Sequence, residues 1–369
     1  MNKKRSFMEN PAVTSFLASL ISIAAGLVFG FILLLILKPS AAVGGMSAML
    51  STGFSSLDRV AKVLYQAAPL LMCGLSVGFA FKTGLFNIGA TGQYTMGAFF
   101  ALFCAIQFQM PWWACLIAST IGGAIWGLFP GLFKALFNVN EVITSIMFNW
   151  IGMYLVNLIF ANTPKTLASY WGKNNSDRTA ALQDANPDAM IPKAGLDKLF
   201  NSPYMSISIF IAVGIAILMY VILQKTTFGY ELKACGMNRF ASQYAGINAK
   251  RNIILSMVIS GALAGIGGGL YYLAGTGQYV LEKALLTRGF DGIPVALLAN
   301  SHPLGTVLSS FFISYLSVGG NAMQPNFSSE AINIIIAVII YLSAFGLLMR
   351  SMLTEAAKRR KEKKEEAGK

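Results

Sequence analysis

Long apolar runs that carry almost no charge recur along the chain and limit what it can fold into. The first extends from Val13 to Leu37 without a charged residue, and a helix needs about 20 such residues to cross a bilayer. Of the 369 residues, 55% are hydrophobic and 12% are charged, whereas soluble domains carry about 25% charged residues. Because an α-helix satisfies its own backbone groups in lipid, the runs predict an all-α, polytopic membrane protein.

We expect about ten transmembrane crossings, some of them broken or re-entrant. They lie at residues 13–37, 63–81, 84–108, 112–133, 140–160, 205–223, 252–274, 285–300, 304–318 and 331–349. The segment 285–300 is interrupted by Asp291 and Pro294, so we interpret it as a half-helix or re-entrant crossing. Crossings two to five and seven to ten form two blocks with opposite entry directions, an arrangement that an inverted repeat would produce.

The basic residues indicate the orientation of the chain. The formal net charge is +13, and most Lys and Arg fall at the predicted inner ends of the spans and in the tail, as the positive-inside rule requires. We therefore predict both termini in the cytoplasm, a transmembrane domain at 1–357 and a basic cytoplasmic tail at 358–369. The small-residue segment 39–60 and the long loop 162–204 are then external. No nucleic-acid partner is expected, because the basic residues do not gather on one soluble face.

Several chemistries are missing from the sequence. It contains no GxxxxGK[ST] motif, so this chain offers no P-loop for ATP. The single histidine, His302, lies beside Pro303 without a nucleophile arrangement, and no carboxylate pair within a span has the spacing of metal ligands. The four cysteines show no CxxC or Cys/His spacing. We predict no catalytic residue, no metal site and no cofactor in this chain, which disfavours an intramembrane enzyme.

Polar side chains inside otherwise apolar spans mark a candidate route for a solute. Amides and glycines are unfavourable in lipid unless they face protein or a water-filled cavity. The candidate pathway residues are Phe86, Asn87, Gln93, Glu141, Asn149, Trp150 and Asp291. Amides that pair with base edges or ribose hydroxyls, together with rings that stack, would suit a neutral, flat solute such as a nucleoside. Close helix packing, with the amides bonded to their neighbours, explains the segment 84–108 equally well.

Glycines recur at every fourth residue in the span 252–274. The sequence SGALAGIGGG places Gly261, Gly265 and Gly269 close to one helix face. Because glycine has no side chain, such a face lets the backbone of a neighbouring helix approach closely. We therefore expect close helix crossings along this span.

A charged segment at 225–251 interrupts the apolar pattern just before that span. Asn238 is a good N-cap, Arg239–Ala245 supplies about two helical turns, and Gly246 supplies the left-handed residue that follows a helix. Two basic residues then mark the boundary between water and lipid. We predict a short capped helix on the cytoplasmic side, which is either a docking element for a partner or an ordinary interfacial loop helix.

Four stretches resemble a known family, the ABC-importer permeases of the ribose/branched-chain/nucleoside type, and most of all its nucleoside-uptake branch. They are FGYELKACGMNRFASQYAGI with the SGALAGIGG that follows, GLFNIGATGQYTMGAF at 84–99, NEVITSIMFNWI at 140–151 and RGFDGIPVALLANSHPLG at 288–305. The resemblance extends over about residues 60–350 and implies that an ATPase grips the 226–250 loop. The residues implied in this coupling are Glu231, Gly236, Asn238, Arg239, Ala241, Tyr244 and Gly246.

The resemblance also implies the rest of the machinery. A separate cytoplasmic ABC ATPase would bind ATP and Mg, and a second permease subunit, identical or homologous, would lie beside this chain. An external substrate-binding lipoprotein would deliver the small-molecule solute, with the loop 162–204 as its docking surface or as a mere connection. The chain would be a multi-pass protein of the bacterial cytoplasmic (plasma) membrane, surrounded by membrane lipid.

The expected function is therefore the permease subunit of an ATP-driven importer for nucleosides or related purine and pyrimidine compounds. Two alternatives stay open. The same machinery could carry a sugar or a branched-chain amino acid. An ion-coupled secondary transporter would need buried acids, for which Asp291 and Glu141 are the candidates, and it would leave the predicted helix in the 226–250 loop without a purpose.

Overall fold

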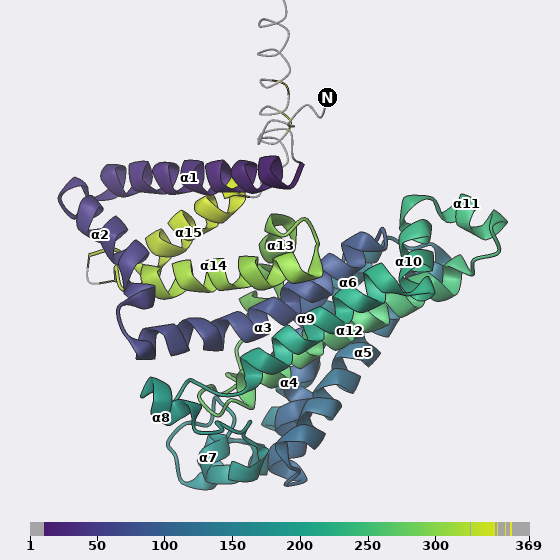
Figure 1. The fold of residues 1–369 in the computed structure, drawn as a ribbon. Coiled ribbons are helices and arrows are strands. Elements are labelled where there is room, and N and C mark those ends of the chain that lie inside the picture. Colours follow the sequence, from purple (N-terminus) through teal and green to yellow (C-terminus); the bar gives the residue numbers. More distant parts are fainter. Residues whose placement is uncertain (1–10, 325, 344, 346–350, 352–354, 356–369) are drawn as a thin grey trace, which may run out of the picture. The chain divides into compact units, whose positions relative to one another are not determined.

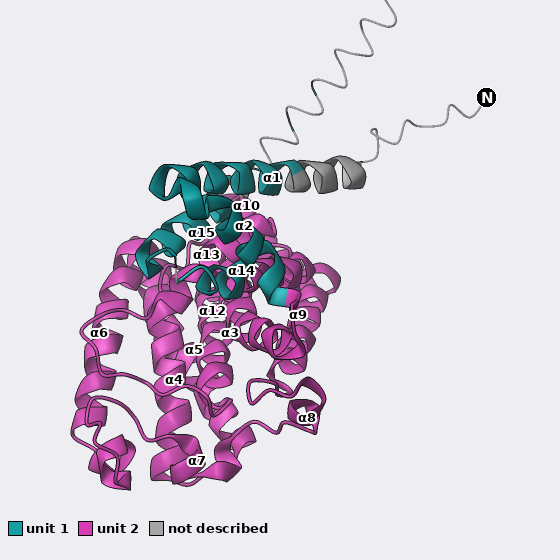
Figure 2. Ribbon diagram, turned by 90° about the vertical axis from the view of Figure 1, so that its left-hand side faces the viewer, with its two compact units in different colours: residues 1–53, 316–369 teal, residues 54–315 magenta. Residues whose placement is uncertain are grey.

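The computed structural model describes residues 11–324, 326–343, 345, 351 and 355. All regular elements of the described residues are helices. The described β-structure consists of two isolated bridges, Leu167–Thr179 and Arg178–Val280. The all-α class predicted from the apolar runs is confirmed for this part of the chain. This part divides into two compact units, one made of the described residues up to Gly53 and from Leu316 onward, and the other of Phe54–Tyr315 (Figure 1, Figure 2).

The smaller unit is built around α1 (Pro11–Leu37), which packs against α15 (Ser329–Ser343). Gly26 and Gly30 make this contact close, since a Cβ added to Gly26 would lie 3.2 Å from the Cα of Ile339. Without a side chain, Gly26 meets the backbone of α15, and Gly30 leaves room for the side chains of Ile339 and Ile335. The last part of α14 also belongs to this unit.

Helix α2 (Pro39–Ser51) and the 3₁₀ turn η2 (Thr52–Phe54) follow α1 directly. Pro39 cannot continue the preceding helix but fits the first turn of a new one. Much of the segment 39–60, which we expect to be a small-residue connection, is therefore helical. The predicted tail at 358–369 lies outside the described residues, as does nearly all of the tenth crossing beyond Ser343.

The larger unit contains the remaining helices. The long ones are α3 (Leu57–Lys82), α4 (Ala90–Gln107), α5 (Trp112–Phe137), α6 (Glu141–Ala161), α9 (Ser208–Lys225), α10 (Thr227–Met237), α12 (Ala249–Tyr272), α13 (Thr287–Leu298) and the first part of α14 (Pro303–Asn321). The short ones are η3 (Pro164–Thr166), η4 (Ala168–Trp171), α7 (Leu182–Ala185), η5 (Pro187–Ala189), α8 (Leu196–Phe200) and α11 (Arg239–Tyr244). α10 and α11 lie at one end of this unit, and α7 and α8 lie at the other (Figure 1).

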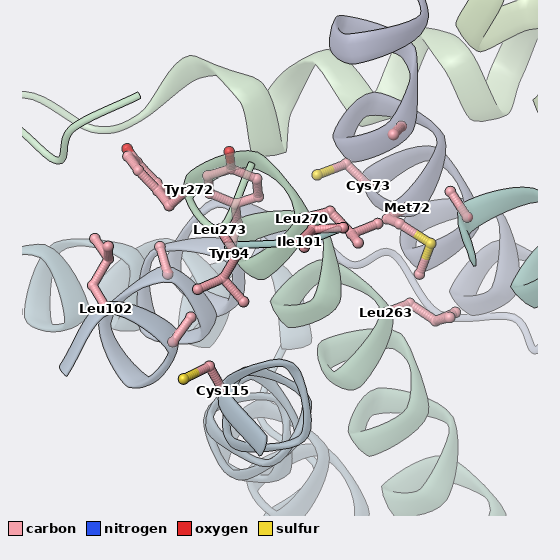
Figure 3. Packing of buried hydrophobic residues seen from close by; sticks show 14 of the residues in the cluster. Met72, Cys73, Tyr94, Leu102, Cys115, Ile191, Leu263, Leu270, Tyr272 and Leu273 are labelled. Atoms are coloured by element: carbon pink, nitrogen blue, oxygen red, sulfur yellow. The ribbon is translucent and has the colours of Figure 1, made fainter. Parts of the chain in front are cut away.

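Helix α12 forms the centre of the packing in the larger unit, where it contacts α3, α4 and α5. Gly261 and Gly265 face the glycines of α5, and a Cβ added to Gly265 would lie 2.9 Å from the Cα of Gly123. Ser119 Oγ donates a hydrogen bond to the carbonyl of Gly265 at 2.5 Å. The predicted close crossings along this span are thus confirmed. Figure 3 shows buried side chains from α3, α4, α5 and α12 in the surrounding core.

Six helices in the described part of the chain are long and apolar enough to cross a membrane: α3, α5, α6, α9, α12 and α14. Shorter apolar stretches lie at Ile21–Leu37 and Ser329–Leu342. Two of the ten predicted crossings are not regular spans, because α4 begins with the polar sequence ATGQYT and α13 has 12 residues with Pro294 inside. Irregular segments are therefore present where the sequence predicts them, and the inverted repeat stays a prediction.

The segment 162–204 is folded onto the ends of neighbouring helices. Asn186 Nδ2 donates to the carbonyl of Ala105 at 2.9 Å, and Ile191 N donates to the carbonyl of Leu273 at 2.8 Å. These bonds tie the segment to α4 and to the end of α12. It lies at the opposite end of the larger unit from the 225–251 segment (Figure 1), as expected if the two lie on opposite sides of a membrane.

Candidate functional site

The chain between α3 and α4 is irregular, and this break contains the first of the predicted pathway residues. Gly84 has φ +74°, a left-handed conformation that favours glycine. Leu85 N bonds back to the carbonyl of Ala80 at 3.0 Å, so the stretch is held against the end of α3. The break therefore precedes α4, and Asn87 lies within it.

Asn87 is the centre of a buried hydrogen-bond cluster. Its Nδ2 donates to Gln93 Oε1 and to Ser260 Oγ, both at 2.7 Å, with Ser76 Oγ at 3.2 Å. Gln93 Nε2 donates in return to Asn87 Oδ1 at 3.1 Å, and the two serine hydroxyls bond to each other at 3.0 Å. All four side chains have no exposed surface. The cluster thus joins α3, the break, α4 and α12.

In this conformation the two amides are occupied by protein groups. A buried amide that loses its partners costs about 1–3 kcal/mol for each unsatisfied group, so the cluster strongly favours this one arrangement of the break. The interpretation in which the amides bond to their neighbours therefore describes Asn87 and Gln93 in the structure. Direct contact of either amide with a solute stays a prediction.

Asn149 reaches across from α6 to complete the start of α4. Its Oδ1 accepts from the backbone N–H of Gly92 at 2.8 Å, and its Nδ2 donates to the carbonyl of Ile88 at 3.1 Å. The N-cap residue of α4 is Gly89, which has no side chain to accept from the first-turn N–H groups. Asn149 therefore acts as an N-cap supplied by another helix, a role that the sequence did not indicate.

Glu141 begins α6 and is paired with a cation. Its Oε2 lies 2.8 Å from Lys134 Nζ, near the end of α5, and the carboxylate also suits the positive end of its own helix. Asn140 is the N-cap of this helix, because its Oδ1 accepts from Val142 N at 2.8 Å. The ion pair stabilises the connection between α5 and α6 in this conformation.

The two predicted pathway aromatics, Phe86 and Trp150, pack against other aromatic rings. Phe86 stacks on Phe81 with ring centroids 5.0 Å apart. Trp150 is 39% exposed and stacks with Tyr154 at 6.2 Å. Further large apolar side chains of α6 are also exposed, namely Ile143, Ile146, Met147, Ile151, Leu155 and Leu158. Trp150 thus belongs to an apolar outer face of α6, the kind of surface that lipid or a second membrane subunit would cover.

Asp291 is exposed on α13, which packs against α3 and α4. Nearly one turn earlier, the guanidinium carbon of Arg288 lies 4.2 Å from the ring centroid of Tyr271, and the Tyr271 ring stacks with that of Tyr65 at 5.4 Å. These three neighbours are absent from the predicted site residues, because nothing in their spacing shows that α3, α12 and α13 meet here. The sequence signal that could have identified this group is Arg288 itself, a charged residue within the predicted half-helix at 285–300.

The capped helix predicted in the 225–251 segment is confirmed. Asn238 Oδ1 accepts from the backbone N–H of Ala241 at 3.0 Å at the start of α11, and Gly246 has φ +80°. A second helix, α10, precedes it and was not predicted. Its N-cap is Thr226, whose Oγ1 accepts from Gly229 N at 3.0 Å.

The surface of α10 and α11 exposes large apolar and aromatic side chains. Tyr244 is 95% exposed and Met237 is 89% exposed, and Phe240 and Tyr230 are also exposed. Beside them, an open groove of about 510 Å³ is lined by Thr227, Tyr230, Glu231, Ala234, Met237, Asn238, Ala241, Ser242, Ala245 and Ile247. We call Tyr230, Met237, Phe240 and Tyr244 the loop patch.

The remaining predicted coupling residues divide between this surface and the interior. Ala241 lines the groove, and Arg239 is half-buried at the start of α11. Glu231 also lines the groove, and its Oε2 accepts from Asn252 Nδ2 at 3.3 Å. Gly236 lies in α10, outside the capped helix, and meets the break before α4: a Cβ added to Gly236 would lie 2.7 Å from Gly84 N.

Residues 59–344 match the protein family described as the permease component of the branched-chain amino acid transport system. The chain belongs to this permease family. The resemblance to ABC-importer permeases is thereby confirmed. The family match also supports a multi-pass membrane protein. The match includes the amide cluster, α13 and the loop patch, so the candidate site lies wholly within the family region of the permease.

Three relatives place the permease more narrowly. It is 35% identical over 350 residues to the guanosine ABC transporter permease protein NupP of Bacillus subtilis, covering 93% of this chain and 97% of the relative. It is 32% identical over 349 residues to the nucleoside ABC transporter permease protein NupB of Lactococcus lactis, covering 92% and 93%. It is 25% identical over 280 residues to the guanosine ABC transporter permease protein NupQ of Bacillus subtilis, covering 72% and 83%. No solved structure matches the permease.

Proposed function

We propose that the permease is the membrane-spanning subunit of an ATP-driven importer for nucleosides or related purine and pyrimidine compounds. The observation that carries this proposal is the similarity, over more than nine-tenths of the chain, to two permeases named for guanosine and nucleoside transport. A relative from Haloferax volcanii named for glucose transport is 28% identical over 89% of the chain. That similarity supports the same machinery and makes a sugar the second candidate solute.

The motor would be a separate pair of cytoplasmic ATPase subunits that bind ATP and Mg. We place their docking site at the loop patch on α10 and α11. A cluster of exposed aromatic and apolar side chains on a water-facing segment is typical of an interaction surface. ATP binding and hydrolysis would move the 226–250 loop, and the helices that follow would rock between outward and inward access. Hydrolysis takes place on the partner chains, so this chain acts as a translocation subunit and not as an enzyme.

The other partners follow from the same proposal. A second permease subunit lies beside this one, and the similarity to both NupP and NupQ of one organism supports a homologous partner over a second copy. An external substrate-binding lipoprotein docks on the folded segment 162–204. Both termini lie in the cytoplasm of a bacterial cell, with α10 and α11 on the cytoplasmic side.

Uptake by cells tests the solute. A strain without its own nucleoside transport, expressing the permease with its partners, is expected to accumulate labelled uridine or guanosine and to leave labelled ribose, glucose and leucine outside. Depletion of ATP should stop this uptake. Accumulation of a sugar or leucine with indifference to nucleosides would overturn the solute assignment, and uptake that survives ATP depletion but collapses with an ionophore would favour an ion-coupled transporter.

A charge on the loop patch tests the ATPase contact. Replacing Tyr244, which is 95% exposed, with aspartate should weaken ATPase binding about tenfold or more, since exposed aromatic anchors dominate the binding energy of interfaces. Co-purification of the ATPase with the tagged permease measures the effect. Tyr170→Asp is the matched control, because Tyr170 is 62% exposed at the opposite end of the larger unit. Equal ATPase recovery with both variants would contradict the docking assignment.

A further inference from the structure

Two buried hydroxyl groups on α4 have no hydrogen-bond partner among the described residues: Thr91 Oγ1 and Tyr94 OH. Neither side chain has any exposed surface, and buried polar groups in proteins are nearly always bonded. The same helix satisfies the hydroxyl of Thr95, which donates to the carbonyl of Thr91 at 2.8 Å. The two open hydroxyls lie three residues apart and so share one helix face. Figure 3 shows Tyr94 within the core of the larger unit.

Helix α13 covers this face of α4 at a residue without a side chain. A Cβ added to Gly289 would lie 2.5 Å from both the backbone N and the Oγ1 of Thr91. The next residue toward the N-terminus is Arg288, whose guanidinium packs on the Tyr271 ring of α12. The first turn of α13 therefore places an arginine next to the residue that covers Thr91, and Gly289 has no side chain to bond with either hydroxyl.

Aromatic rings complete the surroundings of Arg288. Its guanidinium carbon lies 4.2 Å from the Tyr271 ring centroid, an arrangement typical of cation–π contacts. The Tyr65 ring stacks with Tyr271 at 5.4 Å and lies 5.5 Å from the ring of Tyr204. These rings are half-buried, so part of their surface is accessible.

The exposed face of α13 is unsuited to lipid. Asp291 is exposed in the chain, and a carboxylate within a membrane segment is expensive unless it faces water or protein. Arg288 and Asp291 lie three residues apart and on neighbouring positions of one face of α13. That face therefore borders either an aqueous route or another subunit.

We propose that Thr91, Tyr94, Tyr271 and Arg288 form a recognition site for the heteroaromatic base of a transported nucleoside. This inference rests on the proposed function and extends it to particular side chains. The hydroxyls on α4 would bond with polar atoms on the edge of the base, and the Tyr271 ring and the Arg288 guanidinium would supply flat surfaces for stacking. Asp291 beside Arg288 offsets the local positive charge, which favours a neutral nucleoside over a nucleotide.

The structure presents this site closed, since α13 covers Thr91. A solute reaches the hydroxyls when α13 separates from α4, and the glycine contact at Gly289 allows this separation without unlocking interdigitated side chains. Transporters expose a site near the middle of the membrane by rocking or gating one bundle of helices against another, and α13 would separate from α4 during such a movement. The site would thus open and close once in each transport cycle.

Removing the hydroxyl of Tyr94 tests the site with a small change. Tyr94→Phe takes away a group that has no partner among the described residues, so the stability of the permease should not fall. Uptake of labelled guanosine or uridine by cells with the complete transporter should fall about 3- to 10-fold, the effect of losing one hydrogen bond to the solute. The ratio of guanosine to uridine uptake should also shift, because the two bases present different edges.

Tyr279→Phe is the matched control. The Tyr279 hydroxyl donates to Asn157 Oδ1 at 3.1 Å, so its removal should lower the melting temperature of the purified transporter and leave the guanosine to uridine ratio unchanged. If Tyr94→Phe transports both nucleosides at the wild-type rate and ratio, the site assignment is wrong while the proposed function stands. If the wild type transports neither nucleoside, both fall together.

Thiol labelling tests the opening of the site without relying on transport rates. In a variant whose four natural cysteines are replaced by alanine, Thr91→Cys should react with a membrane-impermeant thiol reagent during ATP-driven cycling, and saturating guanosine should slow the reaction. Phe108→Cys is the control, because Phe108 is 62% exposed at the other end of α4, and guanosine should leave its labelling rate unchanged. Labelling of position 91 that is insensitive to guanosine would overturn the proposed contact.

Discussion

Replacing Gly265 with valine is expected to prevent the permease from folding. Gly265 lies at the crossing of α12 and α5, where an added Cβ would lie 2.5 Å from the carbonyl oxygen of Ser119 and 2.9 Å from the Cα of Gly123. On its other side, Gly97 of α4 meets the backbone of Gly265 directly. The atoms that an added Cβ would meet are backbone atoms of α5, so no side-chain rotation relieves the clash.

The effect should be large because α12 packs against three helices at once. Overpacking a core with extra carbon atoms costs about 1–3 kcal/mol where side chains can adjust, and a clash with backbone atoms, which cannot rotate away, should exceed that. Total stabilities of single domains are only about 5–15 kcal/mol. Size-exclusion chromatography of a fluorescent fusion in mild detergent should therefore show aggregate or no signal for Gly265→Val.

Gly214→Val is the matched control for this substitution. Gly214 lies exposed on α9, with no atom within 4 Å of an added Cβ, so valine there should give the wild-type elution profile. A single monodisperse peak of wild-type height for Gly265→Val would show that the α12–α5 crossing is not as close as the structure has it.

The features that the sequence predicted well are those determined by residues close together in the chain. The cap at Asn238 and the left-handed Gly246 lie within one short segment, and their chemistry needs no partner from elsewhere. The glycine face of the 252–274 span likewise follows from a spacing of four residues. Even so, α10 was missed, although Thr226 provides an N-cap of the same kind three residues before Gly229.

The candidate site was harder to predict because its contacts join distant segments. Asn149 caps α4 by bonding to Gly92, which lies 57 residues earlier in the chain. No local pattern marks which helix a lone amide will reach. The sequence identified polar residues in apolar spans but could not pair them. It therefore gathered Asn87, Glu141 and Trp150 into one pathway, whereas the structure gives each of them a different environment.

Replacing Gly236 with alanine is expected to separate ATPase docking from transport. An added Cβ on Gly236 would lie 2.6 Å from the carbonyl carbon of Thr83 and 2.7 Å from Gly84 N. Both are backbone atoms, and Gly84 is fixed in a left-handed conformation at φ +74°. The methyl group must therefore push α10 away from the break before α4.

This contact connects α10, which carries Tyr230 and Met237 of the loop patch, to the interior of the permease. Beyond Gly84 the break leads to Asn87, whose amide bonds join α3, α4 and α12. If an ATPase displaces α10, as proposed, the movement would act on the break, which the amide cluster holds in place. If the contact between Gly236 and Gly84 is disturbed, an ATPase should still bind the loop. Tyr244 and Phe240 lie on α11 and stay exposed.

Two measurements distinguish the outcomes for Gly236→Ala. Recovery of the ATPase with the tagged permease should equal that of the wild type, whereas nucleoside uptake should fall to background and ATP hydrolysis should no longer respond to the loaded binding protein. Gly44→Ala, a helical position with no atom within 4 Å of an added Cβ, should leave all three unchanged. Wild-type uptake by Gly236→Ala would show that force reaches the interior by another route. Loss of the ATPase would instead place Gly236 in the docking surface, since the loop patch alone would then be insufficient for binding.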